Sequence, residues 1–270
     1  MQYKMIATDL DDTLLDDNSN VSVRNREAIL AAVEKGVKFV IATGRMFRTS
    51  VGYLADIGLD GDSHIINYHG ALLKRAKSGE ILLHRPLQNS MAIEIADEAQ
   101  KKDCHVSLFI DDNLYISGEN EYSRYYQSLA KIELEEVGDL SLYLSRTKSD
   151  PSKMSIIRWD GKLDDVEAGL KKSFGSKLSI LQSRPYFLEI TDRQATKGQT
   201  LGWLAESEGI KAEEIIAFGD GHNDLDMLEY AGLGVAVANA RPELLAAADL
   251  VTSSNMEDGV AEVIEKYILS

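Results

Sequence analysis

The stretch Met5–Leu15 constrains the fold more than any other part of the sequence, because a short apolar run ends there in a cluster of acids. The run Met5–Ala7, near the N-terminus and bounded by polar residues, predicts a buried strand. Strands buried on both faces are typical of parallel sheets, whose ligands bind beyond the carboxyl ends of the strands. Asp9 lies at that end, and Asp11 points the same way if the backbone stays extended. Two such carboxylates repel each other unless a cation lies between them, and Mg²⁺ binds oxygen ligands of this kind.

Strand and helix patterns alternate through residues 1–83 and again through residues 187–270. This alternation predicts βαβ units with right-handed crossovers, and therefore an α/β fold with a doubly wound parallel sheet. The strands are predicted near residues 5–7, 37–43, 64–68, 214–220, 235–237 and 250–252. The helices are predicted near residues 22–35, 47–57, 197–209, 223–231, 242–248 and 259–268. Such a sheet brings the polar residues that follow its strands to one edge.

The pattern changes between residues 84 and 186. Helices are predicted at residues 90–101, 121–129 and 163–174, and strands at 106–110, 114–117, 153–159, 178–182 and 186–190. Two pairs of these strands follow each other closely, which predicts hairpins with antiparallel pairing. The stretch 130–152 shows no clear pattern. We therefore predict a separate α+β domain at residues 84–186, inserted into a parallel-sheet domain formed by residues 1–83 and 187–270.

Composition argues against several classes of partner. The formal net charge is −15, and an acidic surface repels nucleic acids and anionic membranes. Cys104 is the only cysteine, so no disulfide can form within the chain, which fits a reducing compartment. We see no leader before the first predicted strand, and no apolar run approaches the roughly 18 residues that span a bilayer. We therefore expect a cytoplasmic protein with no nucleic-acid or membrane partner, and we make no prediction of its oligomeric state.

Further polar residues follow predicted strands or begin a predicted helix. They are Thr43-Gly44-Arg45, Lys197-Gly198 and Gly219-Asp220-Gly221-His222-Asn223-Asp224. Together with Asp9-Leu10-Asp11-Asp12-Thr13, they resemble in order the four motifs of haloacid-dehalogenase superfamily phosphatases, in the form found in the Cof-like subgroup. That subgroup has an α+β cap between its second and third motifs, where the insertion is predicted here. The resemblance covers nearly the whole chain and implies a Mg²⁺-dependent phosphatase.

The resemblance also implies a role for each residue that matches a motif. Asp9 would be the nucleophile that forms a phosphoaspartate, and Asp11 would protonate the leaving group and then activate water. Mg²⁺ would be held by the Asp9 carboxylate, the backbone carbonyl of Asp11 and Asp220. Asp224 would orient the neighbouring groups. The phosphate oxygens would be bound by Leu10, Thr43, Gly44, Lys197 and Asn223.

Several residues have more than one interpretation. Arg45 could contact the substrate or form a surface salt bridge, and Asn223 could also cap the helix that follows it. Cof-like proteins often carry Asn-Gly-Ala after the third strand, whereas this chain has His69-Gly70-Ala71, so no substrate contact is inferred there. Four residues of the insertion could select the leaving group, although tyrosines at helical spacing also serve packing: Tyr122, Tyr125, Tyr126 and Arg184.

We predict a phosphomonoester hydrolase for small phosphorylated metabolites, such as sugar phosphates or cofactor monophosphates. We expect the cap to open and close over the site. The first alternative is a phosphosugar mutase of the same superfamily, in which the phosphoaspartate returns its phosphate to a sugar. The others are a signalling receiver and a binding protein without hydrolysis. A receiver has no cap and no acid two residues after its phosphorylated aspartate, whereas this chain has Asp11.

Overall fold

The computed structural model describes residues 3–59, 63–130 and 132–270. The chain forms two compact units, which we call the core unit (Met1–Leu83 with Thr196–Ser270) and the inserted unit (His84–Ala195). The predicted fold class, a doubly wound parallel-sheet core with an inserted α+β unit, is confirmed. The second boundary lies later than the predicted 186/187, because the strand β11 (Phe187–Asp192) pairs with β9 and β10 of the inserted unit.

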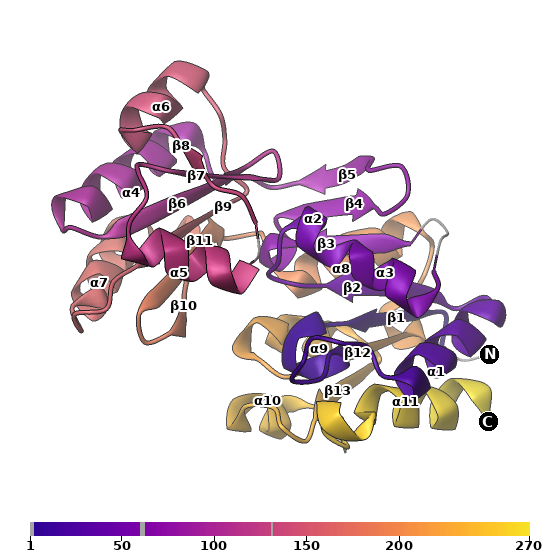
Figure 1. Cartoon of the computed structure of the whole chain (residues 1–270). Helices are drawn as coiled ribbons and strands as arrows, with labels where there is room; N and C mark the ends of the chain where they lie inside the picture. Colours follow the sequence, from indigo (N-terminus) through magenta and orange to yellow (C-terminus); the bar gives the residue numbers. More distant parts are fainter. Residues whose placement is uncertain (1–2, 60–62, 131) are drawn as a thin grey trace. The chain divides into compact units, whose positions relative to one another are not determined.

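An eight-stranded sheet forms the centre of the core unit, in the order β14-β13-β12-β1-β2-β3-β4-β5 (Figure 1). Its strands are β1 (Met5–Thr8), β2 (Lys38–Ala42), β3 (His64–Asn67), β4 (Leu72–Arg75), β5 (Ile81–His84), β12 (Ile215–Gly219), β13 (Leu233–Val237) and β14 (Leu250–Thr252). The strands from β14 to β3 are parallel, whereas β4 runs antiparallel to β3. The sequence analysis did not predict β4 or β5, because only the short turn Tyr68–Gly70 separates β3 from β4.

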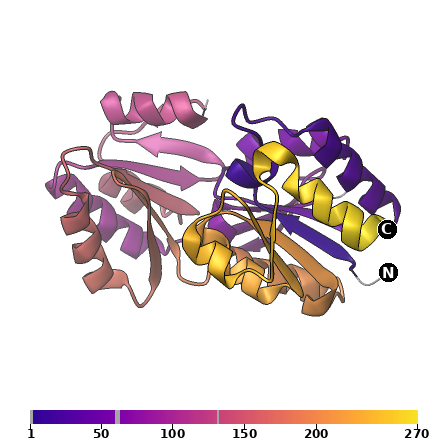
Figure 2. The same cartoon turned by 90° about the horizontal axis from the view of Figure 1, so that it is seen from below.

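Helices cover both faces of this sheet, with the yellow C-terminal helix on one face and the orange helices on the other in Figure 2. The helices of the first face are α1 (Val23–Glu34), α3 (Gly52–Ile57) and α11 (Gly259–Ile264). Those of the second face are α8 (Lys197–Ser207), α9 (Leu225–Tyr230) and α10 (Pro242–Ala247). Along β1, Ile6 packs against the first set and Met5 and Ala7 against the second. This two-sided burial explains why the strand is a continuous apolar run.

Local signals determine several helix ends in the core unit. The Ser22 hydroxyl accepts a hydrogen bond from the Asn25 amide at 3.0 Å, which caps α1. Gly58 ends α3 with a φ of 94°, a left-handed conformation that glycine adopts without strain. The helix predicted at residues 47–57 is divided at Val51 into α2 (Phe47–Ser50) and α3.

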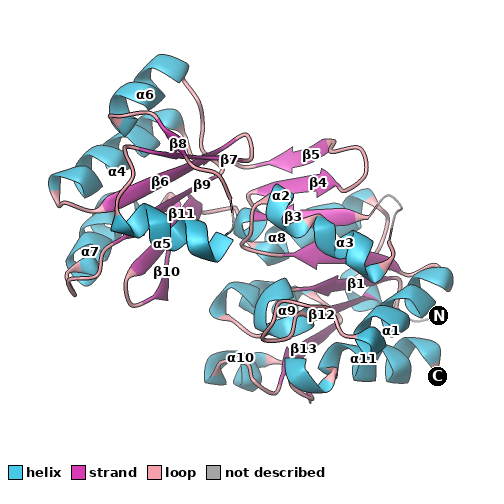
Figure 3. Ribbon diagram, in the orientation of Figure 1, coloured by secondary structure: helices cyan, strands magenta, loops and turns pink. Residues whose placement is uncertain are grey.

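A six-stranded sheet forms the inserted unit, in the order β10-β11-β9-β6-β7-β8 (Figure 3). Its other strands are β6 (His105–Ile110), β7 (Asn113–Ile116), β8 (Glu135–Glu136), β9 (Lys153–Ile157) and β10 (Leu178–Arg184). Its helices are α4 (Asn89–Lys101), α5 (Glu121–Ala130), α6 (Leu140–Thr147) and α7 (Leu163–Phe174). α4, α6 and α7 share one apolar cluster with the sheet. α5 contacts the sheet through other residues, because Tyr126 packs on Phe109 and Phe187, which lie outside that cluster.

Two elements of the inserted unit, β8 and α6, lie in the stretch 130–152, to which the sequence analysis assigned no structure. Asp139 caps α6, since its carboxylate accepts a hydrogen bond from the Leu142 amide at 2.8 Å. The cap and the apolar residues after it were a usable signal. The tyrosines of α5 take part in packing, as Tyr122 contacts Trp159 and Tyr125 contacts Tyr186.

A close approach fixes the start of α8 against the turn that follows β3. Gly70 has a φ of 114°, and a Cβ atom there would lie only 2.2 Å from the Thr196 carbonyl oxygen. The Thr200 hydroxyl also donates a hydrogen bond to the Gly70 carbonyl at 2.7 Å. These contacts hold Lys197, the first residue of α8, in place. No helix among residues 3–59, 63–130 and 132–270 has both the length and the apolar character to cross a membrane.

Candidate active site

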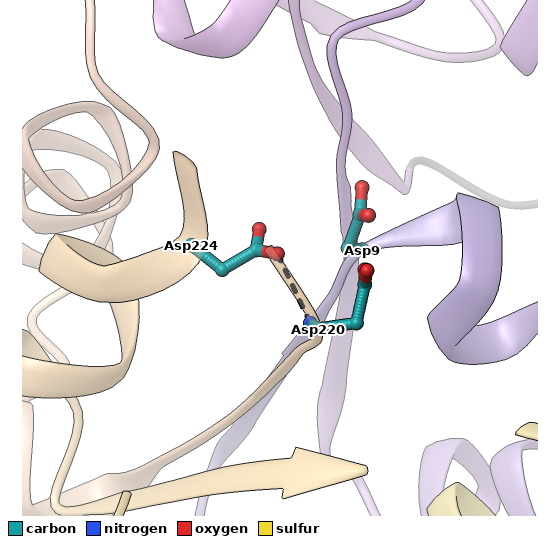
Figure 4. A group of neighbouring side chains, drawn as sticks. All are labelled: Asp9, Asp220 and Asp224. Atoms are coloured by element: carbon teal, nitrogen blue, oxygen red, sulfur yellow. Dashed lines mark hydrogen bonds between the residues drawn. The ribbon is translucent and has the colours of Figure 1, made fainter. Parts of the chain in front are cut away.

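Three aspartates come together at the carboxyl edge of the core sheet. Asp9 directly follows β1, and Asp220 and Asp224 lie in the loop after β12, the strand that pairs with β1 (Figure 4). One carboxylate oxygen from each residue lies within 4.8 Å of the others. We call this group the acid cluster. The parallel register of β1 and β12 therefore brings together residues that are more than 200 positions apart in the sequence.

Lys197 joins two members of the acid cluster. Its ammonium nitrogen donates a hydrogen bond to Asp9 Oδ1 at 2.7 Å and to Asp224 Oδ1 at 2.5 Å. The side chain is completely buried. Burial lowers the pKa of Lys197, but the Asp224 and Asp9 carboxylates raise it more, so this pKa lies above its ordinary value. Lys197 is therefore a charged ammonium ion that faces the Asp9 carboxylate.

The acid cluster carries more negative charge than Lys197 can balance. The pKa of Asp9 is raised well above its usual value, first by burial and then by the charges of Asp224, Asp220 and Asp11, against the lowering effect of Lys197. The pKa of Asp220 is raised to about 6, first by burial and then by the Asp224 charge. When all three carboxylates are ionised, their charge exceeds that of the one ammonium group by two. A divalent cation would remove this repulsion.

The oxygens that remain available fit Mg²⁺. Within the described part of the chain, Asp9 Oδ2 and Asp220 Oδ2 accept no hydrogen bond, so both can serve as ligands. Asp224 is already engaged, because its Oδ1 binds Lys197 and its Oδ2 accepts the amides of Asp220 (3.1 Å) and Gly221 (2.9 Å). Asp224 therefore suits the orienting role implied by the resemblance, and Asp9 and Asp220 suit direct coordination.

The loop that contains Asp224 requires a glycine at position 219, the last residue of β12. A Cβ atom at Gly219 would lie 2.4 Å from the Asp224 side chain, so only glycine permits this approach. α9 begins at Leu225, after a short helical turn at His222–Asp224. The expectation that Asn223 caps the helix is wrong, since Asp224 satisfies the loop amides instead.

The loop after β2 places Thr43, Gly44 and Arg45 at the same edge of the sheet. Thr43 is buried, and its hydroxyl accepts a hydrogen bond from the Arg45 amide at 3.2 Å. The His69 ring lies against Gly44, where a Cβ atom would come within 2.4 Å of His69 Cε1. Asn223 Nδ2 lies 3.4 Å from His69 Nδ1 and donates to it in the tautomer that leaves this nitrogen unprotonated. His69 thus connects two residues expected to bind phosphate.

The Asp11 carboxylate does not join the acid cluster. Both of its oxygens pair with the Arg45 guanidinium, whose Nε lies 2.8 Å from Asp11 Oδ2. Of the two interpretations left open for Arg45, the structure shows a salt bridge. Leu10 is buried, and its amide lies between the two aspartates in the chain.

The sequence analysis assigned no role to two residues that contact the site. The Thr13 hydroxyl donates a hydrogen bond to Asp220 Oδ1 at 3.0 Å, and the Tyr53 hydroxyl accepts one from Arg45 at 2.9 Å. Thr13 ends the first motif, so the motif itself was a signal for it. No sequence signal identified Tyr53, because its contact depends on how α3 lies beside the loop after β2.

Known proteins resemble this chain over nearly its full length. The haloacid dehalogenase-like hydrolase family matches residues 6–264. The 5-amino-6-(5-phospho-D-ribitylamino)uracil phosphatase YwtE of Bacillus subtilis is 32% identical over 288 residues, which cover 98% of each chain. A haloacid dehalogenase-like hydrolase from Bacteroides thetaiotaomicron superposes with a TM-score of 0.89 at 32% identity, covering 98% of this chain and 99% of that one. The subclass IIB sugar phosphatase BT4131 superposes with a TM-score of 0.84 at 26% identity, covering 98% of each.

Proposed function

Because the chain belongs to the haloacid dehalogenase-like hydrolases and is a phosphatase of that family, we propose that it hydrolyses phosphomonoesters of small metabolites through a phosphoaspartate at Asp9. One observation carries the proposal. The Asp9 carboxylate is buried at a strand end, with one oxygen bound to Lys197 and the other free of hydrogen bonds from the described residues. This arrangement leaves Asp9 Oδ2 for the metal ion, and the lysine-bound oxygen, Asp9 Oδ1, would attack phosphorus.

In the first half-reaction, the Asp9 carboxylate oxygen attacks the phosphorus atom. The bond from phosphorus to the leaving oxygen breaks, and that oxygen takes a proton from Asp11. Lys197, Thr43 and the amides of Leu10 and Gly44 would hold the phosphoryl oxygens and stabilise the charge of the transition state. Mg²⁺, bound by Asp9, Asp220 and the Asp11 carbonyl, would neutralise negative charge on the transferred group.

In the second half-reaction, a water oxygen attacks the phosphorus atom of the phosphoaspartate. The water proton passes to Asp11, and the bond between phosphorus and Asp9 breaks, which restores the Asp9 carboxylate. The overall change is an ester plus water giving an alcohol and inorganic phosphate. Asp11 ends the cycle protonated and can serve as the acid again.

The proposed substrates are phosphorylated sugars or sugar-like compounds, including phosphorylated precursors of cofactors. Two similar proteins support this class: YwtE is named for a substrate with a phosphorylated ribityl group, and BT4131 is described as a sugar phosphatase. In the name of YwtE, the phosphate is carried by a ribityl group, which is a small polyhydroxylated chain. Small size also fits the negative charge of this chain, which disfavours large anionic substrates.

The experiment is phosphate release from a panel of phosphomonoesters, with Mg²⁺ and with EDTA. Asp9→Asn keeps the size of the side chain but removes the nucleophilic oxygen, so we expect activity to fall by roughly 10⁴-fold or more. Asp12→Asn is the matched control, because Asp12 is an exposed acid of the same loop with a φ of 57°, which asparagine tolerates. Release that survives Asp9→Asn in pure protein would contradict the proposal. Isomerised sugar phosphate without free phosphate would indicate the mutase instead.

A further inference from the structure

The Asp11 carboxylate has one partner, although Asp11 is the proposed acid and base. Arg45 Nε donates to Asp11 Oδ2 at 2.8 Å, and Arg45 Nη2 donates to Asp11 Oδ1. Within residues 3–59, 63–130 and 132–270, no other group binds this carboxylate, and half of the side chain is exposed. An exposed aspartate is free to change rotamer in water, whereas a two-pronged contact with arginine selects one orientation. Arg45 therefore determines where the Asp11 oxygens lie.

Arg45 is itself fixed at both ends. Its Nη1 donates a hydrogen bond to the Tyr53 hydroxyl at 2.9 Å, and its guanidinium carbon lies 5.2 Å from the centre of the Tyr53 ring. Its amide donates to the Thr43 hydroxyl at 3.2 Å. Its carbonyl oxygen accepts hydrogen bonds from Asn67 Nδ2 (3.1 Å) and from the Tyr68 amide (3.2 Å). A side chain held in this way can position its partner, whereas a mobile surface arginine cannot.

The contact engages both oxygens of the Asp11 carboxylate, so it fixes the plane of the carboxyl group as well as its rotamer. The proposed cycle needs an Asp11 oxygen beside the leaving group in the first half-reaction and beside the attacking water in the second.

We propose that Arg45, braced by Tyr53, is a positioning residue that holds Asp11 as the base for hydrolysis of the phosphoaspartate. This inference rests on the proposed function. In the step concerned, the water oxygen bonds to phosphorus, the water proton passes to Asp11, and the bond from phosphorus to Asp9 breaks with its electron pair. Formation of the phosphoaspartate uses Asp11 only to protonate the leaving oxygen, so this half-reaction is insensitive to Arg45 when the leaving group needs little protonation. With such a substrate, the two half-reactions should depend on Arg45 to different extents.

The test is rapid mixing of the Mg²⁺-bound enzyme with p-nitrophenyl phosphate, whose leaving group needs little protonation. Arg45→Met keeps the apolar stem but removes the charge and both donors. We expect release of about one equivalent of p-nitrophenolate at nearly the wild-type rate, followed by turnover slowed roughly tenfold to a hundredfold. Because only the second half-reaction is slowed, kcat and KM should fall together and kcat/KM should change little. Intact-mass measurement should show the accumulated phosphoenzyme.

Two further variants separate positioning from other roles. Tyr53→Phe removes only the hydroxyl that braces Arg45, so it should shift turnover in the same direction by a smaller factor. In an Asp11→Asn background, Arg45→Met should cause no additional change, because Arg45 acts through Asp11. The Tyr53→Phe measurement keeps the inference testable if Arg45→Met folds poorly.

Other results would overturn the inference. A lower kcat/KM for Arg45→Met, without accumulation of phosphoenzyme, would mean that Arg45 binds the substrate. Equal losses from Arg45→Met in the wild-type and Asp11→Asn backgrounds would show that Arg45 acts independently of Asp11. A failure of the proposed function looks different, since no phosphoenzyme would then form in wild type or in any variant, including Asp11→Asn after a single turnover.

Discussion

Replacing Asp220 with asparagine should make the metal-free protein more stable while removing its activity. The pKa of Asp220 is raised from its ordinary value of 3.8 to about 6, first by burial and then by the Asp224 charge. A rise of this size corresponds to about 3 kcal/mol of unfavourable ionisation in the folded chain. Asparagine keeps the oxygen that accepts the Thr13 hydrogen bond but carries no charge. Asp220→Asn should therefore raise the free energy of unfolding by up to about 3 kcal/mol in EDTA at neutral pH.

The sign of the pH dependence follows from the direction of this shift. A carboxyl group whose pKa is higher in the folded chain than in the unfolded chain holds its proton more tightly when folded. Its contribution to stability is complete below pH 3.8 and is lost as the pH rises through about 6. The difference in stability between Asp220→Asn and wild type should therefore be small at about pH 4 and large at about pH 7.5.

The assay is urea unfolding followed by tryptophan fluorescence. The chain has two tryptophans, so a Trp159→Phe background leaves Trp203 of α8 as the reporter in the core unit. Asp17→Asn, an exposed acid of the same N-terminal region, is the matched control and should change little. Mg²⁺ should stabilise the parent protein much more than Asp220→Asn, because the variant lacks one proposed ligand. The reasoning is refuted if Asp220→Asn is no more stable than its parent in EDTA at about pH 7.5.

Two other predictions follow from groups held in unusual surroundings. Burial lowers the pKa of His105 to about 4, and Asn120 donates to its Nδ1, so the inserted unit should lose up to about 3 kcal/mol of stability as the pH falls from 6.5 to 4. Trp159 fluorescence should report this loss, and His105→Gln should remove most of the pH dependence; an unchanged dependence would contradict the assignment. Gly44→Ala should reduce kcat/KM at least tenfold, because the new methyl group would meet the His69 ring. Adding His69→Ala should recover much of that activity, and a double variant as impaired as Gly44→Ala alone would count against the steric explanation.

The clustering of the main site residues could be predicted, because these residues lie at the ends of strands. Asp9, Thr43 and Asp220 each follow a short apolar run, and the three strands are neighbours in the sheet. The alternation of strand and helix patterns is enough to place such residues at one edge. The same reasoning predicted the inserted α+β unit but missed β4, β5, β8 and α6. β4, β5 and β8 are short, so the sequence signal for them is weak, whereas α6 carried a signal in its Asp139 cap and the apolar residues after it.

The pairings between side chains could not be predicted in the same way. Asp11 pairs with Arg45, whereas Asp9 lies in the acid cluster, although both aspartates belong to the first motif. This direction depends on the turn after Asp11, in which Asp12 has a φ of 57°. His69 likewise has a φ of 60° and lies against Gly44. Residues other than glycine adopt such angles only where the surrounding structure imposes them, so a single sequence does not reveal them.

The charges of the site connect its stability with its proposed chemistry. The chain as a whole carries a formal charge of −15, and the fully ionised acid cluster exceeds the charge of Lys197 by two. A phosphate dianion approaching this edge without a cation would meet repulsion from both. A bound divalent cation would cancel the excess negative charge of the acid cluster. Lys197 could then bind the phosphoryl oxygens without opposing repulsion from the carboxylates. The charge imbalance that destabilises the metal-free fold therefore also makes substrate binding depend on the metal, and the KM for substrate should rise as Mg²⁺ becomes limiting.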